Sequence, residues 1–265
     1  MMSEALNYST YLHLDGLLRQ QAPRSAAEGE PEHDELLFIV IHQVYELWFK
    51  QMLHEFDYLC TLLRQNQRAR ANHTLLRLRT ILKTIVGQVD ILETMTPLEF
   101  NAFRAYLESG SGFQSVQFRE IEFMLGYKRA NMFKHYPPDT FGLERLRRRF
   151  EQPTLWDAFL AFLALNGYPV PAVQLTRDVT QPLAASAEVQ ALLIDVYRND
   201  AAVRGVCEHL VDLDEGCMEW RYRHVKMVER TIGGKPGTGG SPGAAYLVAT
   251  LRPFFPDLWE IRSRL

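Results

Sequence analysis

Two histidines lie on the apolar faces of predicted helices, where an imidazole could bind a metal or a haem iron. His42 shares one side of its helix with Phe38, Tyr45 and Phe49, at spacings of four, seven and eleven residues from Phe38. His224 lies on the inner stripe of another long helix, within the segment WRYRH. A core histidine whose ring nitrogens are satisfied by neighbouring groups fits each position on its own. Together, the two residues favour a metal or haem cavity inside a helical bundle.

Several other metal sites are excluded by the motifs that they require. The sequence has no CxxCH motif for covalent c-type haem, no HExxH motif and no EF-hand loop. It also lacks the two helix-borne ExxH motifs of a di-iron centre. Cys60, Cys207 and Cys217 form no CxxC pair, so we expect reduced thiols in a cytosolic protein.

Residues 233–243, called the glycine loop below, contain six of the 16 glycines of the chain. Their backbone amides can approach an anion or another ligand closely. The segment follows a predicted helix and lacks the order GxxxxGK[ST], so it is neither a P-loop nor a Rossmann turn. It is either a flexible linker or, given its Thr, Lys and Ser residues, a loop that closes on something polar.

Arg104 follows Phe100 by four residues in the segment FNAFRAYL. An arginine among aromatic residues can bind a carboxylate in a pocket shielded from water, although a solvated surface arginine is the more common case. The basic run at residues 145–149 is typical of a solvated face, and we assign it no function. Tyr8 and Tyr11 near the N-terminus could serve in packing alone.

Helical periodicity runs through almost the whole chain and predicts an all-α protein. The clearest stripe occupies residues 75–92, and a capping box at Thr96 predicts a helix from Pro97 toward Leu107. A weaker N-cap signal stands at Thr154, and prolines favour an extended connection over residues 170–182. The expected organisation is an arm at residues 1–33 and one helical-bundle domain at residues 34–265.

Composition excludes two classes of partner. The chain has 265 residues, with 29 Lys and Arg against 32 Asp and Glu, so it offers no excess of positive charge for nucleic acid. Its longest apolar run, residues 158–165, is too short to cross a membrane, and its start does not resemble a signal peptide. We therefore expect a cytoplasmic protein that binds neither nucleic acid nor membranes.

Four segments together resemble the tryptophan 2,3-dioxygenase family. They are NYSTYLHLDGLL, HDELLFIVIHQVYELWFKQMLHEFD, FRAYLESGSGFQSVQFREIE and WRYRHVKMVERTIGGKPGTGGSPGAAYL. They occur in the order of the family, from about residue 7 to about residue 248. The resemblance implies a helical homotetramer with one non-covalent haem b in each subunit. It implies a reaction in which O₂ opens the indole ring of L-tryptophan and gives N-formylkynurenine.

The resemblance also implies roles for individual residues. By the motif WRxxH, His224 would be the proximal ligand of the haem iron, and by FIxxHQ, His42 would lie on the distal side near the indole N–H. Phe38 would pack against the indole ring, and Arg104 would bind the substrate carboxylate. Thr238, in GTGGS, would help to hold the ammonium and carboxylate groups as the glycine loop closes.

Four further positions follow from the same resemblance. Ser111 and Gly112 would lie beside the cofactor, while Tyr8 and Tyr11 match an arm that a neighbouring subunit lends to the pocket. Phe100 would contact the substrate, but some bacterial members carry tyrosine at this position, so one hydroxyl contact to the carboxylate is missing here.

Three alternatives stay open at this point. A related haem monooxygenase would insert one oxygen atom into a substituted tryptophan or indole and yield an oxindole. A non-catalytic haem sensor would not need Arg104, Thr238 and a closing loop together. A helical scaffold without a cofactor would leave the two histidines and the glycine loop unexplained.

Overall fold

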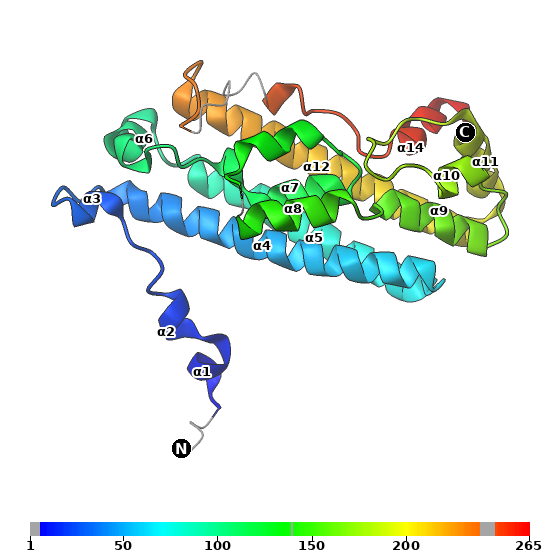
Figure 1. The fold of residues 1–265 in the computed structure, drawn as a ribbon, viewed down its shortest axis with the longest axis horizontal. Coiled ribbons are helices and arrows are strands. Elements are labelled where there is room, and N and C mark those ends of the chain that lie inside the picture. The colour runs from blue at the N-terminus through cyan, green and yellow to red at the C-terminus, as the bar shows by residue number, and fades with distance from the viewer. Residues whose placement is uncertain (1–5, 139, 239–246) are drawn as a thin grey trace.

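Three long helices build the core of the chain. The structure is a computed structural model that describes residues 6–138, 140–238 and 247–265. Over these ranges the chain is helical and contains no strand, which confirms the predicted all-α class. The long helices are α4 (His33–Arg64), α5 (Arg68–Leu92) and α12 (Ala201–Ile232). Helix α5 packs against both α4 and α12 along the long axis of the molecule (Figure 1).

The apolar stripe of α5 explains its central position. Every position of the predicted stripe is buried: Leu75, Leu78, Leu82, Ile85, Val89 and Leu92. Burying an aliphatic side chain of this size contributes about 1.5–3 kcal/mol, so the stripe holds α5 between its two neighbours.

Shorter helices surround this core. Helix α7 (Val116–Met124) packs against α4 and α8 (Phe141–Phe150), and α9 (Leu155–Leu165) also packs against α4. Helices α11 (Ala187–Asn199) and α14 (Pro256–Glu260) pack against each other and against α12. Beyond the arm, the other elements with bounds in the described part of the chain are α6 (Pro97–Phe103), α10 (Ala172–Leu175) and the 3₁₀ helices η1 (Arg104–Leu107), η2 (Gly112–Gln114), η3 (Ala130–His135) and η4 (Ile261–Arg264).

Capping boxes begin two of these helices. The Thr96 hydroxyl accepts a hydrogen bond from the Glu99 amide, and the Glu99 carboxylate accepts one from the Thr96 amide, which confirms the predicted start of α6. Thr154 forms the same reciprocal pair with Asp157 at the start of α9, so its signal is stronger than expected. The helix predicted to reach Leu107 keeps its α-helical form only to Phe103 and then tightens into η1.

The expectation of an extended connection over residues 170–182 is wrong at one point. Helix α10 forms one helical turn there, closed by a hydrogen bond from the Thr176 amide to the Ala172 carbonyl at 3.1 Å. Pro171 stands directly before this turn, at a position where a missing backbone N–H costs nothing.

The predicted arm contains α1 (Tyr8–Leu12), α2 (Leu14–Leu17) and α3 (Arg24–Ala27). Helices α1 and α2 lie away from the bundle (Figure 1). Helix α3 is attached to it, because the buried Glu35 carboxylate accepts hydrogen bonds from the backbone amides of Arg24 and Ser25 at 2.8 and 2.9 Å.

Two expectations drawn from composition can be compared with the structure. The three cysteines are free and buried, in agreement with the expected thiols. Within the described ranges, no helix combines the length and the apolar character that crossing a membrane would require.

Candidate functional site

A cavity of about 240 Å³ lies among α4, α5 and α12, on the side of the bundle where α6, η1 and the glycine loop meet it. Its lining is mainly apolar. The sequence predicted ten site residues, and the eight that line this cavity are Phe38, His42, Phe100, Arg104, Ser111, Gly112, His224 and Thr238. Residues from position 38 to position 238 of the sequence are therefore brought together in one place.

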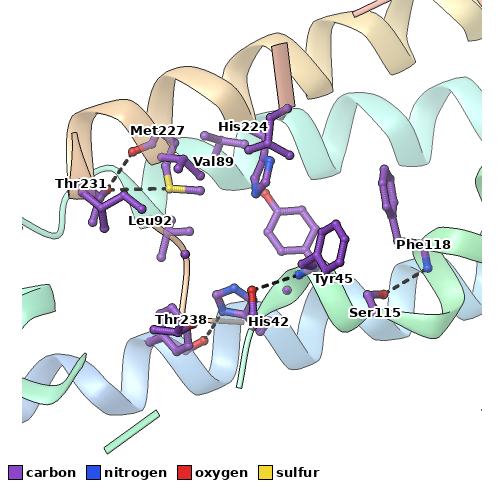
Figure 2. Close-up of a pocket in the computed structure, with 18 of the residues that line it drawn as sticks. His42, Tyr45, Val89, Leu92, Ser115, Phe118, His224, Met227, Thr231 and Thr238 are labelled. Atoms are coloured by element: carbon purple, nitrogen blue, oxygen red, sulfur yellow. Dashed lines mark hydrogen bonds between the residues drawn. The ribbon is translucent and has the colours of Figure 1, made fainter. Parts of the chain in front are cut away.

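The two histidines face the cavity from different helices. Figure 2 shows His42 on α4 and His224 on α12, with the cavity between them. Since α5 separates these two helices along much of their length, the arrangement is a consequence of the three-helix core. A flat ligand in the cavity would present one face to each histidine.

The hydrogen bond of His42 fixes which ring nitrogen carries its proton. Nδ1 lies 2.7 Å from the carbonyl oxygen of Phe38. A carbonyl only accepts, so Nδ1 carries the proton, and in the neutral ring Nε2 then has a free lone pair. Burial lowers the pKa of His42 below its usual value and favours this neutral form. His42 is therefore able to accept a hydrogen bond from a ligand N–H.

His224 is a half-buried imidazole without a hydrogen-bond partner among the described residues. Burial, with a further contribution from His42, lowers its pKa to about 4, so its ring is neutral near pH 7. Its ring stacks on Trp220, with centroids 5.2 Å apart and planes inclined by 5°. A neutral imidazole with unused nitrogen atoms beside a cavity is suited to bind a metal.

Arg104 and Thr238 connect the rim of the cavity to the glycine loop. The Arg104 guanidinium donates to the Pro236 carbonyl at 2.7 Å, and the Thr238 hydroxyl donates to the Gly110 carbonyl. The described part of the glycine loop thus already contacts the segment that follows α6. Residues 239–243 of this loop lie outside the described residues.

The turn from Leu107 to Gly110 at this rim was not predicted. A hydrogen bond from the Gly110 amide to the Leu107 carbonyl, at 2.7 Å, closes it. Glu108 has φ 49° and ψ −114°, a conformation that strongly favours glycine. Its carboxylate pairs with Arg24 of α3 at 3.0 Å, and Tyr106 donates to Glu30 at 3.0 Å. The segment 24–30 therefore contacts the rim.

A buried carboxylate with arginine partners was also missed. Glu122 of α7 pairs with Arg119 and with Arg129, and it pairs with Arg221 of α12 at 2.8 Å. Burial alone would raise the pKa of Glu122, but these arginines outweigh that effect and lower it. Arg221 also donates to the Thr250 carbonyl at 2.7 Å. Arg221 belongs to the segment WRYRH, which was the one available signal.

Tyr8 and Tyr11 lie apart from the cavity of their own chain. Their side chains are 76% and 68% exposed, on α1 in the projecting arm. The cavity of this chain therefore does not include them.

The groups around the cavity fit haem better than a metal bound by protein ligands alone. Among the described residues there is no cluster of three His, Cys, Asp or Glu side chains that could hold an ion. Haem needs only one axial protein ligand because the porphyrin supplies the other donors. His224 offers that ligand, the apolar lining suits a macrocycle, and Arg104 and Arg119 at the cavity could face carboxylates.

Comparison with known proteins places the whole chain in one family. A family model described as "Tryptophan 2,3-dioxygenase" matches residues 1–167 and 168–265. The chain is 64% identical over 264 residues to tryptophan 2,3-dioxygenase of Herpetosiphon aurantiacus, with 100% of both chains covered. It is 54% identical over 266 residues to the enzyme of that name from Anaeromyxobacter dehalogenans, covering 99% of this chain and 97% of the other. With the Caulobacter vibrioides enzyme of that name, identity is 42% over 268 residues and coverage is 100% of both.

Proposed function

Because this chain belongs to the tryptophan 2,3-dioxygenase family, we propose that it uses O₂ to open the C2–C3 bond of the indole ring of L-tryptophan. The product is N-formylkynurenine, and both atoms of O₂ enter it. The observation that carries this proposal is the pair of neutral histidines on two sides of one apolar cavity, one of them without a hydrogen-bond partner among the described residues.

The cofactor that the family implies is haem b, with His224 as its protein ligand. When bound, haem supplies ferrous iron, which activates O₂ for attack on the electron-rich indole bond. The chain's contribution on this side is a neutral, half-buried imidazole whose nitrogen atoms form no hydrogen bond with the described residues. One ligand is the number required, because the opposite face must stay open to O₂.

His42 positions the indole on the other side of the cavity. Its Nδ1 proton is held by the Phe38 carbonyl, so Nε2 accepts the hydrogen bond from the indole N–H. Phe38 itself lines the cavity, and its ring is 4.1 Å from that of His42 between centroids. His42 orients the substrate in this account and need not remove a proton, because an indole N–H is a very weak acid.

The rim binds the polar end of the amino acid. Arg104 can form charge-assisted hydrogen bonds with the substrate carboxylate, and these exceed neutral ones in strength. In the structure, Nη2 of the Arg104 guanidinium donates to the Pro236 carbonyl. Thr238 lies on the same loop, so binding of the carboxylate and closure of the loop act on the same groups. Closure also excludes water from the reacting atoms.

The arm supports a homotetramer in which one subunit completes the pocket of another. Exposed apolar side chains are concentrated there, including Leu6, Tyr8, Tyr11, Leu12 and Leu18. A projecting segment of this composition is typical of a protein–protein contact. We propose that Tyr8 and Tyr11 enter the cavity entrance of a second copy of this chain.

The test is an isotope experiment on hemin-loaded, anaerobically reduced protein. L-Tryptophan and ¹⁸O₂ are added, and the product is read by mass spectrometry. Two labelled atoms in a ring-opened product support the dioxygenase. One labelled atom on an intact indole skeleton would identify the monooxygenase instead. A normal haem spectrum without any product, from tryptophan or substituted tryptophans, would point to a haem sensor.

A further inference from the structure

Trp220 is the only described aromatic ring stacked nearly parallel on His224. The two residues are four positions apart on α12, so their side chains lie one above the other on the same helix face. Their planes differ by 5°, with centroids 5.2 Å apart. A single helix therefore supplies both the proposed iron ligand and a flat surface beside it.

Other aromatic rings hold Trp220 in turn. Phe118 of α7 lies 4.8 Å from it between centroids, while Tyr45 and Phe49 of α4 meet it nearly edge-on at 6.2 and 6.1 Å. Tyr45 is itself fixed, because its hydroxyl donates to the Ile85 carbonyl on α5 at 2.9 Å. The indole plane of Trp220 is thus set by rings from two other helices, α4 and α7, and a third helix, α5, fixes one of those rings.

The imidazole of His224 lacks the hydrogen bond that usually orients a metal-bound histidine. A metal-bound histidine normally donates its second ring N–H to a carboxylate or carbonyl, and this hydrogen bond sets the ring plane. For His224 no such partner exists among the described residues. His42 shows the contrast within the same cavity, since its Nδ1 binds the Phe38 carbonyl.

We propose that Trp220 is the positioning residue for His224. The indole of Trp220, held by the neighbouring rings, stacks on the imidazole and restricts its rotation. This stacking keeps a ring nitrogen directed into the cavity and takes the role that a hydrogen bond to the protein normally has. This inference rests on the proposed role of His224 as the haem ligand. It adds that the strength of the iron–imidazole bond depends on Trp220.

The test uses ferrous holoprotein and two readouts besides activity. One is the rate of haem transfer to an excess of apomyoglobin, and the other is the iron–histidine stretching band in the resonance Raman spectrum. Trp220→Leu should lose haem at least about tenfold faster, as is typical when the group orienting a ligand is removed. Its Raman band should broaden or shift, and Trp220→Phe, which keeps a flat ring, should stay close to the unchanged protein.

Phe49→Leu is the matched control. Phe49 lines the same cavity and contacts Trp220, but it makes no ring contact with His224. Phe118 and Tyr45 still contact Trp220 in this variant, so its Raman band should stay in place. If Trp220→Leu folds, as judged by circular dichroism, and matches Phe49→Leu in both readouts, the inference is overturned. If Trp220→Leu does not fold, Trp220→Phe and Trp220→Met are compared instead, because Phe keeps a flat ring and Met only fills the space. Equal rates of haem loss from these two variants would overturn the inference.

Failure of the underlying proposal gives a different result. If the unchanged protein shows no iron–histidine band, or if His224→Ala retains both the band and the haem, His224 is not the ligand and the proposed function needs revision. A band that requires His224 but ignores Trp220 would contradict only the role of Trp220.

Discussion

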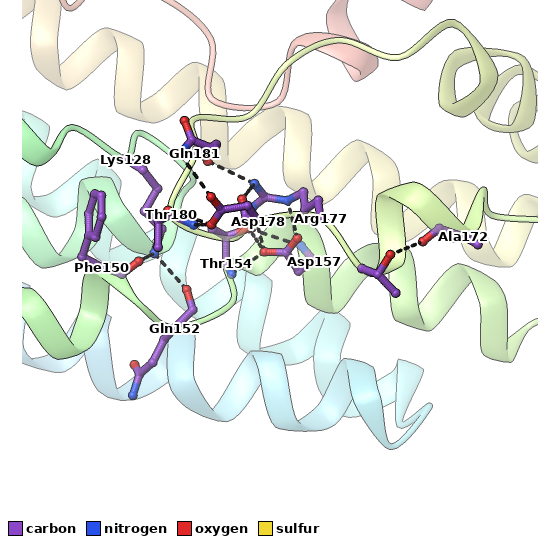
Figure 3. Close-up of polar contacts among 11 residues, drawn as sticks. Lys128, Phe150, Gln152, Thr154, Asp157, Ala172, Arg177, Asp178, Thr180 and Gln181 are labelled. Carbon is purple, nitrogen blue, oxygen red and sulfur yellow. Dashed lines mark hydrogen bonds and ion pairs between the residues drawn. The ribbon is translucent and has the colours of Figure 1, made fainter.

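Lys128 is buried and the two cavity histidines are half-buried in the bundle, but their polar atoms are used in opposite ways. The Lys128 ammonium donates to the carbonyl oxygens of Arg149, Phe150 and Gln152 at 2.9, 2.7 and 2.8 Å (Figure 3). His224 has no described partner, and His42 uses one of its two nitrogens. The ammonium of Lys128 therefore forms its hydrogen bonds within the protein, whereas the cavity histidines keep ring nitrogens that form none with the described residues.

The surroundings of Lys128 follow the same pattern. Arg177 binds the Asp157 carboxylate through Nε and Nη2 at 2.6 and 2.9 Å, and Asp157 also caps α9 through Thr154. Figure 3 shows these residues joined in one network, with Asp178 and Gln181 continuing it. Such a network ties the connection after α9 to the helix ends.

The difference shows how a structural polar site can be told from a ligand site. A buried polar group costs stability unless its hydrogen bonds are made. Lys128 meets that condition and stabilises the fold. The histidines do not, so their unused atoms mark where a ligand would complete the structure.

Replacing His224 should have the largest effect and should fall on haem. We expect His224→Ala to lose haem and to lose activity by more than about 100-fold, since ligand loss should exceed the effect of losing an orienting group. Soret absorbance after hemin loading and size exclusion measures this. His54→Ala, an exposed histidine on the same α4 that carries His42, should bind haem normally. A haem-replete His224→Ala protein would contradict the assignment.

Replacing Lys128 should have the opposite effect, on stability alone. Lys128→Met leaves the three carbonyl oxygens without their donor, at a cost of about 2–4 kcal/mol in the free energy of unfolding. Urea denaturation measures the loss, and haem content and KM should not change. Lys83→Met on the exposed face of α5 is the control, with an expected change below about 0.5 kcal/mol. Equal stabilities of the two variants would remove the distinction between the regions.

Arg104→Ala tests the rim of the cavity. Loss of charge-assisted hydrogen bonds to the substrate carboxylate should raise KM about 10- to 100-fold, which corresponds to about 1.5–3 kcal/mol. Haem content should stay normal, because Arg104 is not the proposed ligand. Arg230→Ala, an exposed arginine near the end of α12, should leave KM unchanged. An Arg104→Ala enzyme with normal KM would mean that another group binds the carboxylate.

The pH dependence of kcat/KM tests the neutral form of His42. Burial lowers its pKa below the usual value of a histidine, so the ring is mainly neutral near pH 7 and is protonated at lower pH than an exposed imidazole. Once protonated, Nε2 becomes a donor and cannot accept from the indole N–H. We therefore expect kcat/KM to fall at acidic pH with a midpoint below 6.5, and the fall should disappear in His42→Ala. A fall centred above pH 6.5 that depends on His42 would contradict the buried, neutral ring.

Local patterns predicted the helices, whereas polar partners distant in sequence were missed. The Thr96 capping box and the α5 stripe depend on neighbours three or four positions away, which a single sequence displays. The roles of His42, His224 and Arg104 were suggested by a family resemblance, and the structure places all three at one cavity.

The missed features depend on tertiary contacts. Glu122 and Arg221 are 99 positions apart, and neither has a local pattern that predicts their ion pair. The same is true of Lys128, whose acceptors lie 21 to 24 positions later. Buried polar partners of this kind become visible only when the helices are placed in space.

Glu108→Gly should have the smallest effect. It extends the comparison of the Lys128 region with the cavity region, because it tests whether backbone strain is also concentrated at the cavity. Its present conformation costs about 1–3 kcal/mol, and glycine would relieve this at an entropic cost of about 0.4–1 kcal/mol in the unfolded chain. Loss of the exposed Arg24 pair subtracts up to about 0.5 kcal/mol. The expected net gain is about 0.5–1 kcal/mol in urea denaturation. Glu108→Gln keeps the strain and loses the ion pair, so it should be slightly less stable than the unchanged protein. If the glycine variant were less stable than the glutamine variant, the turn would not be strained, and the unused polar atoms alone would distinguish the cavity region.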